Sequence, residues 1–192
     1  MEFLKSNLLK LIGIVLMSVV AVFALITSIN AFLTASGLRD IPEAMQSLLP
    51  GNPFDVALSQ TNAGAFSYLA IFLAATFIIA ALVIKMFGLR KIAGITLVAG
   101  SVVALSMFVT GIILGSDFID ALSQNAETTR EAYNAMRELP TPPPGSELLI
   151  TAMRAARAAY ITQISQVVIF VIAFGVTPLV LGIKMLVCKK EA

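Results

Sequence analysis

The sequence contains no histidine and no tryptophan, and its only cysteine is Cys188. The absence of histidine removes the commonest ligand for haem and transition metals and the usual general base at neutral pH. A lone cysteine cannot form a disulfide within the chain or build a thiolate metal site by itself. Phosphate-binding loops, nucleophile motifs and glycosylation sequons are also missing. We therefore predict that the protein is not an enzyme and that it holds neither a cofactor nor a metal.

Charged residues are scarce, at 12% of the chain, whereas hydrophobic residues make up 58%. This balance is far from that of soluble proteins. Charges are absent from four long apolar runs, at residues 11–38, 56–84, 92–116 and 158–183. Each run exceeds the roughly 20 residues that a helix needs to cross a ~30 Å hydrocarbon core. The predicted fold class is an all-α integral membrane protein built as a four-transmembrane-helix bundle.

The charges between the runs alternate in sign. Eight of the thirteen basic residues flank the run ends that share one side: Lys5, Lys10, Lys85, Arg90, Lys91, Lys184, Lys189 and Lys190. Nine of the eleven acidic residues belong to the other side. The positive-inside rule therefore predicts a multi-pass protein of the plasma membrane with both termini in the cytoplasm. The first run is longer than the roughly 7–15 apolar residues of a signal peptide, so we expect a retained transmembrane helix.

The boundaries follow from the runs and from the turn residues between them. We place transmembrane helices at about residues 8–33, 64–86, 91–116 and 158–186 of a single membrane domain, 1–192. The external loop at 34–63 is expected to contain a short amphipathic helix at 41–49, which the prolines and glycine at 50–53 end. Only a few residues join the second and third helices, so these two are antiparallel neighbours.

The polar segment at residues 117–157 has a clear helical pattern. Apolar residues recur at three- and four-residue spacing on both sides of a proline-rich break at 140–144. We expect transmembrane helices 3 and 4 to extend into an extracytoplasmic helical hairpin. Its seam is predicted to contain Leu122, Tyr133, Leu149 and Met153. Two helices bury little surface, so the seam needs a cover, either the first external loop or a neighbouring protomer.

Polar side chains gather at the predicted outer ends of the spans. The candidates for a polar cluster are Asn30, Thr34, Gln163 and Gln166. One interpretation is interhelical hydrogen bonding, because an amide in hydrocarbon needs partners. The other is the hydrated vestibule of a pore. No acidic or basic side chain lies inside a run, which argues against a proton-coupled or ion-coupled transporter.

Three further residue patterns bear on packing and anchoring. Gly111 and Gly115 form a small-xxx-small pair, which permits helices to approach closely within the bundle or between subunits. Pro178 is expected to kink the fourth helix by removing a hydrogen bond to the Phe174 carbonyl. Cys188 occupies a position typical of palmitoylated cysteines, although a plain thiol is the simpler interpretation.

The expected topology of four helices, cytoplasmic termini and two external loops resembles that of claudins, tetraspanins and connexins. The resemblance covers topology alone, because this chain lacks the tryptophan and the loop cysteines of those families. We assign no family. The sequence favours a non-catalytic membrane subunit that acts by assembly with itself or with other membrane subunits, and a homo-oligomeric channel is the alternative. Membrane lipids are expected partners, and nucleic acid is not.

Overall fold

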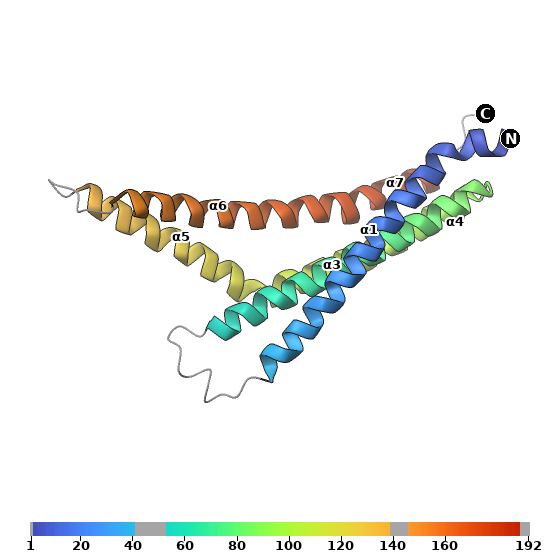
Figure 1. Cartoon of the computed structure of the whole chain (residues 1–192). Coiled ribbons are helices and arrows are strands. Elements are labelled where there is room, and N and C mark those ends of the chain that lie inside the picture. The colour runs from blue at the N-terminus through green and yellow to red at the C-terminus, as the bar shows by residue number, and fades with distance from the viewer. Residues whose placement is uncertain (1, 41–52, 139–145, 189–192) are drawn as a thin grey trace.

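The computed structural model describes residues 2–40, 53–138 and 146–188, and these residues form helices and no strand. Figure 1 shows their arrangement. The helices are α1 (Glu2–Arg39), α3 (Pro53–Met86), α4 (Arg90–Leu114), α5 (Ser116–Arg137), α6 (Ser146–Phe170), the π-helix η1 (Val171–Val176) and α7 (Thr177–Val187). The prediction of an all-helical protein is confirmed.

Four helical stretches are long and apolar enough to cross a membrane: Asn7–Arg39, Phe54–Met86, Arg90–Leu114 and Ile150–Val187. The last of these passes through α6, η1 and α7 without a loop. A helix rises ~1.5 Å per residue, so even the shortest stretch reaches across a ~30 Å hydrocarbon core. The chain therefore has the helices of a multi-pass membrane protein.

The four spans pack as an open row in which each span mainly contacts the next, and the predicted four-helix bundle is not confirmed. α1 packs on α3, α3 packs on α4, and α4 packs on η1 and α7. α1 has no comparable contact with the fourth span. The reason lies in its two faces. Apart from Asn7, its buried residues are small (Ala21, Ala24, Ser28 and Ala35), whereas bulky residues such as Val15, Val19 and Phe23 are exposed. In a membrane such a face is satisfied by lipid and needs no further helix.

Small residues allow the helices of the row to pack closely. Seven of the most buried hydrophobic residues in the described part of the chain are alanines of α3 and α4: Ala65, Ala70, Ala74, Ala75, Ala81, Ala93 and Ala104. The buried Ala24 of α1 belongs to the same cluster as Ala70. One hydrogen bond also crosses the α1–α3 contact, because the buried Ser28 hydroxyl donates to the Ala65 carbonyl at 3.0 Å. Close backbone approach and a polar contact of this kind are the usual means of helix association in lipid.

The structure corrects the expected boundary of the second span. α3 begins at Pro53 and not near residue 64. Proline is accepted in a first helical turn because its missing N–H would have no partner there, and Asp55 in the same turn favours the positive end of the helix dipole. Residues that we assigned to a loop are therefore helical. The expected short helix at 41–49 lies outside the described residues.

The helix that follows the third span does not continue it directly. α4 ends at Leu114, and α5 sets off in a new direction after Gly115 (Figure 1). In a continuous helix the Phe118 N–H would donate to the Leu114 carbonyl. Here the buried Ser59 hydroxyl stands between them. It donates to the Leu114 carbonyl at 2.9 Å and accepts from the Phe118 N–H at 3.2 Å. A side chain inserted into the helical ladder in this way bends the chain.

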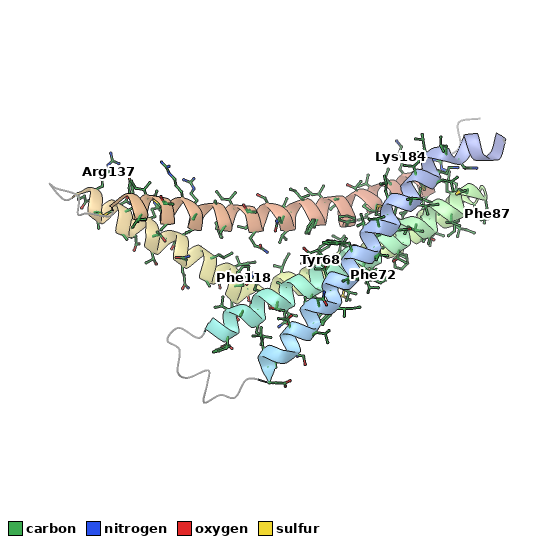
Figure 2. All side chains as sticks on the ribbon, in the orientation of Figure 1. Tyr68, Phe72, Phe87, Phe118, Arg137 and Lys184 are labelled. Atoms are coloured by element: carbon green, nitrogen blue, oxygen red, sulfur yellow. The ribbon has the colours of Figure 1, made fainter. Side chains whose placement is uncertain are left out.

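α5 and α6 pack against each other and form an arm that projects away from the α3–α4 turn (Figure 1). Figure 2 places Arg137 at the far end of this arm, and Phe87 and Lys184 at the opposite end of the molecule. The half-buried residues of α5 include a series at alternating three- and four-residue spacing: Ile119, Leu122, Ala126, Thr129, Tyr133 and Met136. This is the spacing of a coiled-coil seam. However, no residue of α5 is fully buried.

The fourth span changes its helical register before Pro178. Residues Val171–Val176 form a π-helix. The Thr177 N–H and the Thr177 hydroxyl both donate hydrogen bonds to the Ile172 carbonyl, and the hydroxyl lies 2.8 Å from it. The wider turn brings the buried Gly175 against Leu105 of α4, where an added Cβ would lie 2.4 Å from the Leu105 Cδ2 atom. We expected Pro178 to kink the helix because it cannot donate a backbone hydrogen bond. The π-helix before it accommodates this missing hydrogen bond by its wider turn.

Candidate functional site

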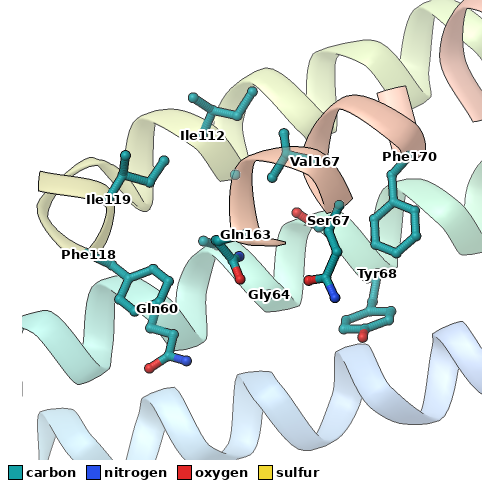
Figure 3. Close-up of a pocket in the computed structure, with 13 residues that line it drawn as sticks. Gln60, Gly64, Ser67, Tyr68, Ile112, Phe118, Ile119, Gln163, Val167 and Phe170 are labelled. Atoms are coloured by element: carbon teal, nitrogen blue, oxygen red, sulfur yellow. The ribbon is translucent and has the colours of Figure 1, made fainter. Parts of the chain in front are cut away.

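A cavity of about 230 Å³ lies where α3, α4, α5 and α6 meet. We call it the glutamine cavity, after the three amides that line it: Gln60, Gln163 and Gln166. Figure 3 shows Gln163 and Phe170 reaching it from α6, Phe118 from α5, and Ser67 and Tyr68 from α3. In this cavity, amide side chains of the fourth span and of α3 share one space.

Local sequence explains why the space exists. Along α3 the lining residues Gln60, Gly64 and Ser67 follow helical spacing, so small and polar groups share one face. On α4 the lining residues are Ile112 and Gly111. The missing side chain of Gly111 lets α4 approach α3, because an added Cβ would lie 3.3 Å from the Ala63 carbonyl oxygen. The bend after Gly115 then carries Phe118 over the cavity, because the Ser59 hydroxyl holds its N–H.

The cavity offers hydrogen bonds without charge. Its polar side chains are amides, the Ser67 hydroxyl and the Tyr68 phenol, and its other lining residues are apolar or small. Amides and hydroxyls both donate and accept hydrogen bonds, so the site suits water or a small neutral polar group. Among the described residues, no carboxylate and no basic side chain lines it.

An apolar cluster closes the cavity towards the middle of the row. Tyr68 and Phe170 line the cavity and also pack on the buried cluster of Ala24, Ala70, Ile71 and Phe108. Phe174, one turn further along the fourth span, joins the same cluster and makes an edge-to-face contact with Phe170 at a centroid distance of 6.4 Å. On this side the cavity is therefore bounded by aromatic and aliphatic side chains, and its polar lining goes no further.

The structure brings together only half of the predicted polar cluster. Gln163 and Gln166 line the glutamine cavity, but Asn30 and Thr34 do not. Both of the latter are exposed on α1, and the Thr34 hydroxyl donates to the Asn30 carbonyl of its own helix at 2.9 Å. The four residues lie near the same ends of their helices. They do not meet, because α1 packs mainly on α3.

The remaining predicted residues have definite places. Gly111 and Gly115 both lie against α3, and an added Cβ on Gly115 would lie 2.6 Å from the Ala63 Cβ. The pair therefore serves a contact within the chain. In the hairpin, Leu122, Tyr133 and Met153 are half-buried, and the Leu149 side chain lies outside the described ones. Cys188 is exposed at the end of α7.

Sequence reasoning missed the contribution of the first turns of α3. Ser59 and Gln60 were assigned to a loop, yet Ser59 holds the bend and Gln60 lines the cavity. A usable signal was present, since Gln60, Ala63, Gly64 and Ser67 follow the i, i+3, i+4, i+7 pattern of one helix face. We did not use this pattern because the prolines at 50 and 53 indicated a loop.

Comparisons with protein-family models, with curated proteins and with solved structures gave no match for this chain. Arguments about its function therefore depend on the chain itself.

Proposed function

We propose that this protein is a non-catalytic membrane subunit that functions by self-assembly, and that the α5–α6 arm forms the contact between copies. The observation that carries this proposal is the incomplete seam of the arm. α5 is amphipathic and polar overall, so it belongs in water, yet none of its residues is buried. A helix pair of this size gains its stability mainly from packing of the apolar face. A second surface is needed to cover what α6 leaves exposed.

The charges on the arm favour a second copy as that surface. Glu127 and Glu131, four residues apart, share one exposed face of α5, and Arg154 and Arg157 share one exposed face of α6. Within the described part of the arm these side chains form no ion pair with one another. In a two-fold dimer the acidic face of each copy can meet the basic face of the other, so a single self-complementary patch satisfies both.

The uncharged exposed face of α6 fits the same arrangement. Ala152, Ala155 and Ala159 are exposed there and follow helical spacing, beside Leu148, which is 76% exposed. Alanines permit a neighbouring helix to approach closely, and an exposed leucine on a water-facing arm gains stability when it is covered. We also infer from the alternating charge that the arm is extracytoplasmic and that the termini are cytoplasmic.

A channel is the second candidate, and the glutamine cavity is the observation that favours it. A pore within one chain would need a polar path beyond Tyr68 and Phe170, and the described residues there are apolar. A pore between copies would need a polar stripe on an exposed face. The exposed faces of the spans carry mainly Val, Ile, Leu and Phe. We therefore place self-assembly first.

The proposal is tested by measuring the stoichiometry of the full-length protein in native-lipid particles. One variant reverses the acids (Glu127→Arg with Glu131→Arg), and another reverses the bases (Arg154→Glu with Arg157→Glu). Each variant alone should lose the oligomer, because it brings like charges together. Co-expressed, the two variants should form mixed oligomers, because one is then basic on both faces and the other acidic on both.

The matched control reverses two exposed charges away from the arm, Arg39→Glu with Asp40→Arg, and should assemble like the parent. Mass photometry or native mass spectrometry reports the number of chains in each particle. A parent protein that is monomeric at all concentrations would overturn the proposal. Full assembly of both reversed variants would show that the arm faces are not the contact.

A further inference from the structure

We propose that the chain binds an anionic glycerophospholipid at the end opposite the arm, with the headgroup in a basic cavity and an acyl chain in an adjoining apolar groove. This inference is independent of self-assembly. It rests on two cavities that share residues and that differ sharply in chemistry.

The basic cavity has a volume of about 490 Å³. Four cationic side chains line it, each from a different helix of the row: Lys10, Lys85, Arg90 and Lys184. No carboxylate is among its lining residues. The lysine-rich ends of spans are a general consequence of membrane topology. Membrane topology alone does not require one cation from each span to converge on one cavity. This convergence concentrates positive charge at a point where a phosphate would fit.

Local geometry orients two of these cations and adds to the positive field. The Lys10 ammonium donates to the Asn7 Oδ1 atom at 2.6 Å, which fixes the lysine beside the buried Asn7. Arg90 is the first residue of α4, and no side chain caps that helix end. The positive end of the α4 dipole therefore lies at the cavity and favours an anion. The guanidinium of Arg90 can in addition contact a phosphate with two hydrogen bonds.

The apolar groove lies directly beside the basic cavity and has a volume of about 290 Å³. The two share Lys85, Leu181 and Met185. From these shared residues the groove extends along the spans to Ile78 of α3 and to Ala173 before Pro178. Seven residues separate Ile78 from Lys85, which corresponds to about 10 Å of helix at ~1.5 Å per residue.

The open row explains why the groove is not filled by protein. Gly94 and Gly182 draw α7 onto α4. The described residues that line the groove come from α3, α4 and the fourth span, and α1 contributes none of them, although its Gly13 lies near Leu82. A free phosphate would use only the basic cavity and would leave the groove without an occupant. A phospholipid uses both, because its charged headgroup and its acyl chain are joined in the order that the two cavities present. We therefore assign the site to a phospholipid.

The absence of tryptophan makes a direct test possible, because one introduced tryptophan reports from one place. Leu82→Trp places the reporter in the groove. Val19→Trp places a reference on the exposed face of α1, where the Val19 side chain is 65% exposed. The protein is reconstituted in vesicles of phosphatidylcholine and phosphatidylglycerol, with brominated acyl chains on one lipid at a time. Quenching of the reporter then gives the preference for each lipid. Should Leu82→Trp fail to fold, Ile78→Trp reports from the same groove.

We expect brominated phosphatidylglycerol to be preferred at position 82 and not at position 19, by about fivefold for each basic residue that contacts the headgroup. The variant Arg90→Gln with Lys184→Gln should lower the preference by about fivefold for each of the two charges removed, because Lys10 and Lys85 remain. The matched control Lys91→Gln removes a neighbouring exposed charge that does not line the cavity, and it should retain the preference.

Four results would overturn the assignment. Equal quenching by the two lipids at position 82 would show that the groove has no headgroup selectivity, and absence of quenching by either would show that protein fills it. Loss of the preference in Lys91→Gln would reduce the effect to general surface charge. Added inorganic phosphate should leave the quenching unchanged, and displacement of the lipid by millimolar phosphate would reassign the basic cavity to a free anion.

Discussion

Gly94 of α4 and Gly182 of α7 face each other, backbone against backbone, where the fourth span crosses α4. A Cβ built on Gly94 would lie 3.0 Å from the Gly182 carbonyl oxygen, and one built on Gly182 would lie 2.9 Å from the Gly94 carbonyl oxygen. Each glycine thus makes room for the backbone of the other. Because backbone atoms and not flexible side chains set these distances, the contact cannot absorb a methyl group without separation of the helices.

The first prediction follows from this contact. Gly182→Ala should force α7 away from α4 and lower the free energy of unfolding by about 1–3 kcal/mol. The control is Gly37→Ala, where an added Cβ meets nothing within 4 Å. That change should be neutral or should stabilise α1 by up to ~1 kcal/mol through helix propensity. Unfolding in mixed micelles of SDS measures both variants. Equal stability of Gly182→Ala and the parent would contradict the contact.

The second prediction concerns the bend between α4 and α5. Ser59→Ala removes the hydroxyl that separates the Leu114 carbonyl from the Phe118 N–H, so these two groups can bond directly and straighten the helix. We expect a loss of about 1–2 kcal/mol and a shift in distance between spin labels at Thr34 and Thr128, in a Cys188→Ser background.

Ser116→Ala is the control for the bend, because the exposed Ser116 hydroxyl bonds only to the Ile113 carbonyl of the preceding turn, at 2.9 Å. It should leave the label distance unchanged. A distance that is the same in Ser59→Ala and in Ser116→Ala would mean that the bend does not depend on the Ser59 hydroxyl.

The bend also shows where prediction from the sequence ends. The four apolar runs and the helical spacing of the arm are local patterns, so the four membrane-length helices and the α5 and α6 helices could be expected from them. Ser59 and Leu114 are 55 residues apart in the chain, and no local pattern announces a hydroxyl inserted into a distant helix. The start of α3 was missed because Pro53 has the sequence signature of a breaker and the position of a first-turn residue.

Grouping of site residues failed for a related reason. Depth along a helix can be estimated from residue number, and on that basis Asn30 was placed with Gln163. Whether two side chains lie close together depends on which helices pack against each other, and in the open row α1 does not pack on α6. The π-helix before Pro178 likewise depends on the contact between Gly175 and Leu105, which involves another span.

The third prediction concerns orientation, which we infer from the alternating charge. Single cysteines at Thr128 and Phe87, both exposed, are placed in a Cys188→Ser background. An impermeant thiol reagent added to intact cells should label position 128 and not position 87. Lysed cells should show labelling of both, which controls for reactivity. Labelling of position 87 alone in intact cells would reverse the orientation.

The last prediction separates a packing role of the glutamine cavity from a conducting one. Gln163→Leu replaces an amide that lines the cavity with an apolar side chain of similar size. If the cavity serves packing, the change removes about one interhelical hydrogen bond, worth ~0.6 kcal/mol, and assembly should be almost unchanged. If the cavity is a vestibule, the added apolar group should favour dewetting and reduce ion flux while the oligomer survives.

We expect the packing outcome and no conductance in the parent protein, because Tyr68 and Phe170 lead from the cavity into the apolar cluster around Phe108. Flux through reconstituted vesicles measures this directly, with Gln124→Leu on the exposed face of α5 as the matched substitution outside the cavity. A reproducible conductance in the parent that Gln163→Leu abolishes and Gln124→Leu preserves would make the channel the better account of the molecule.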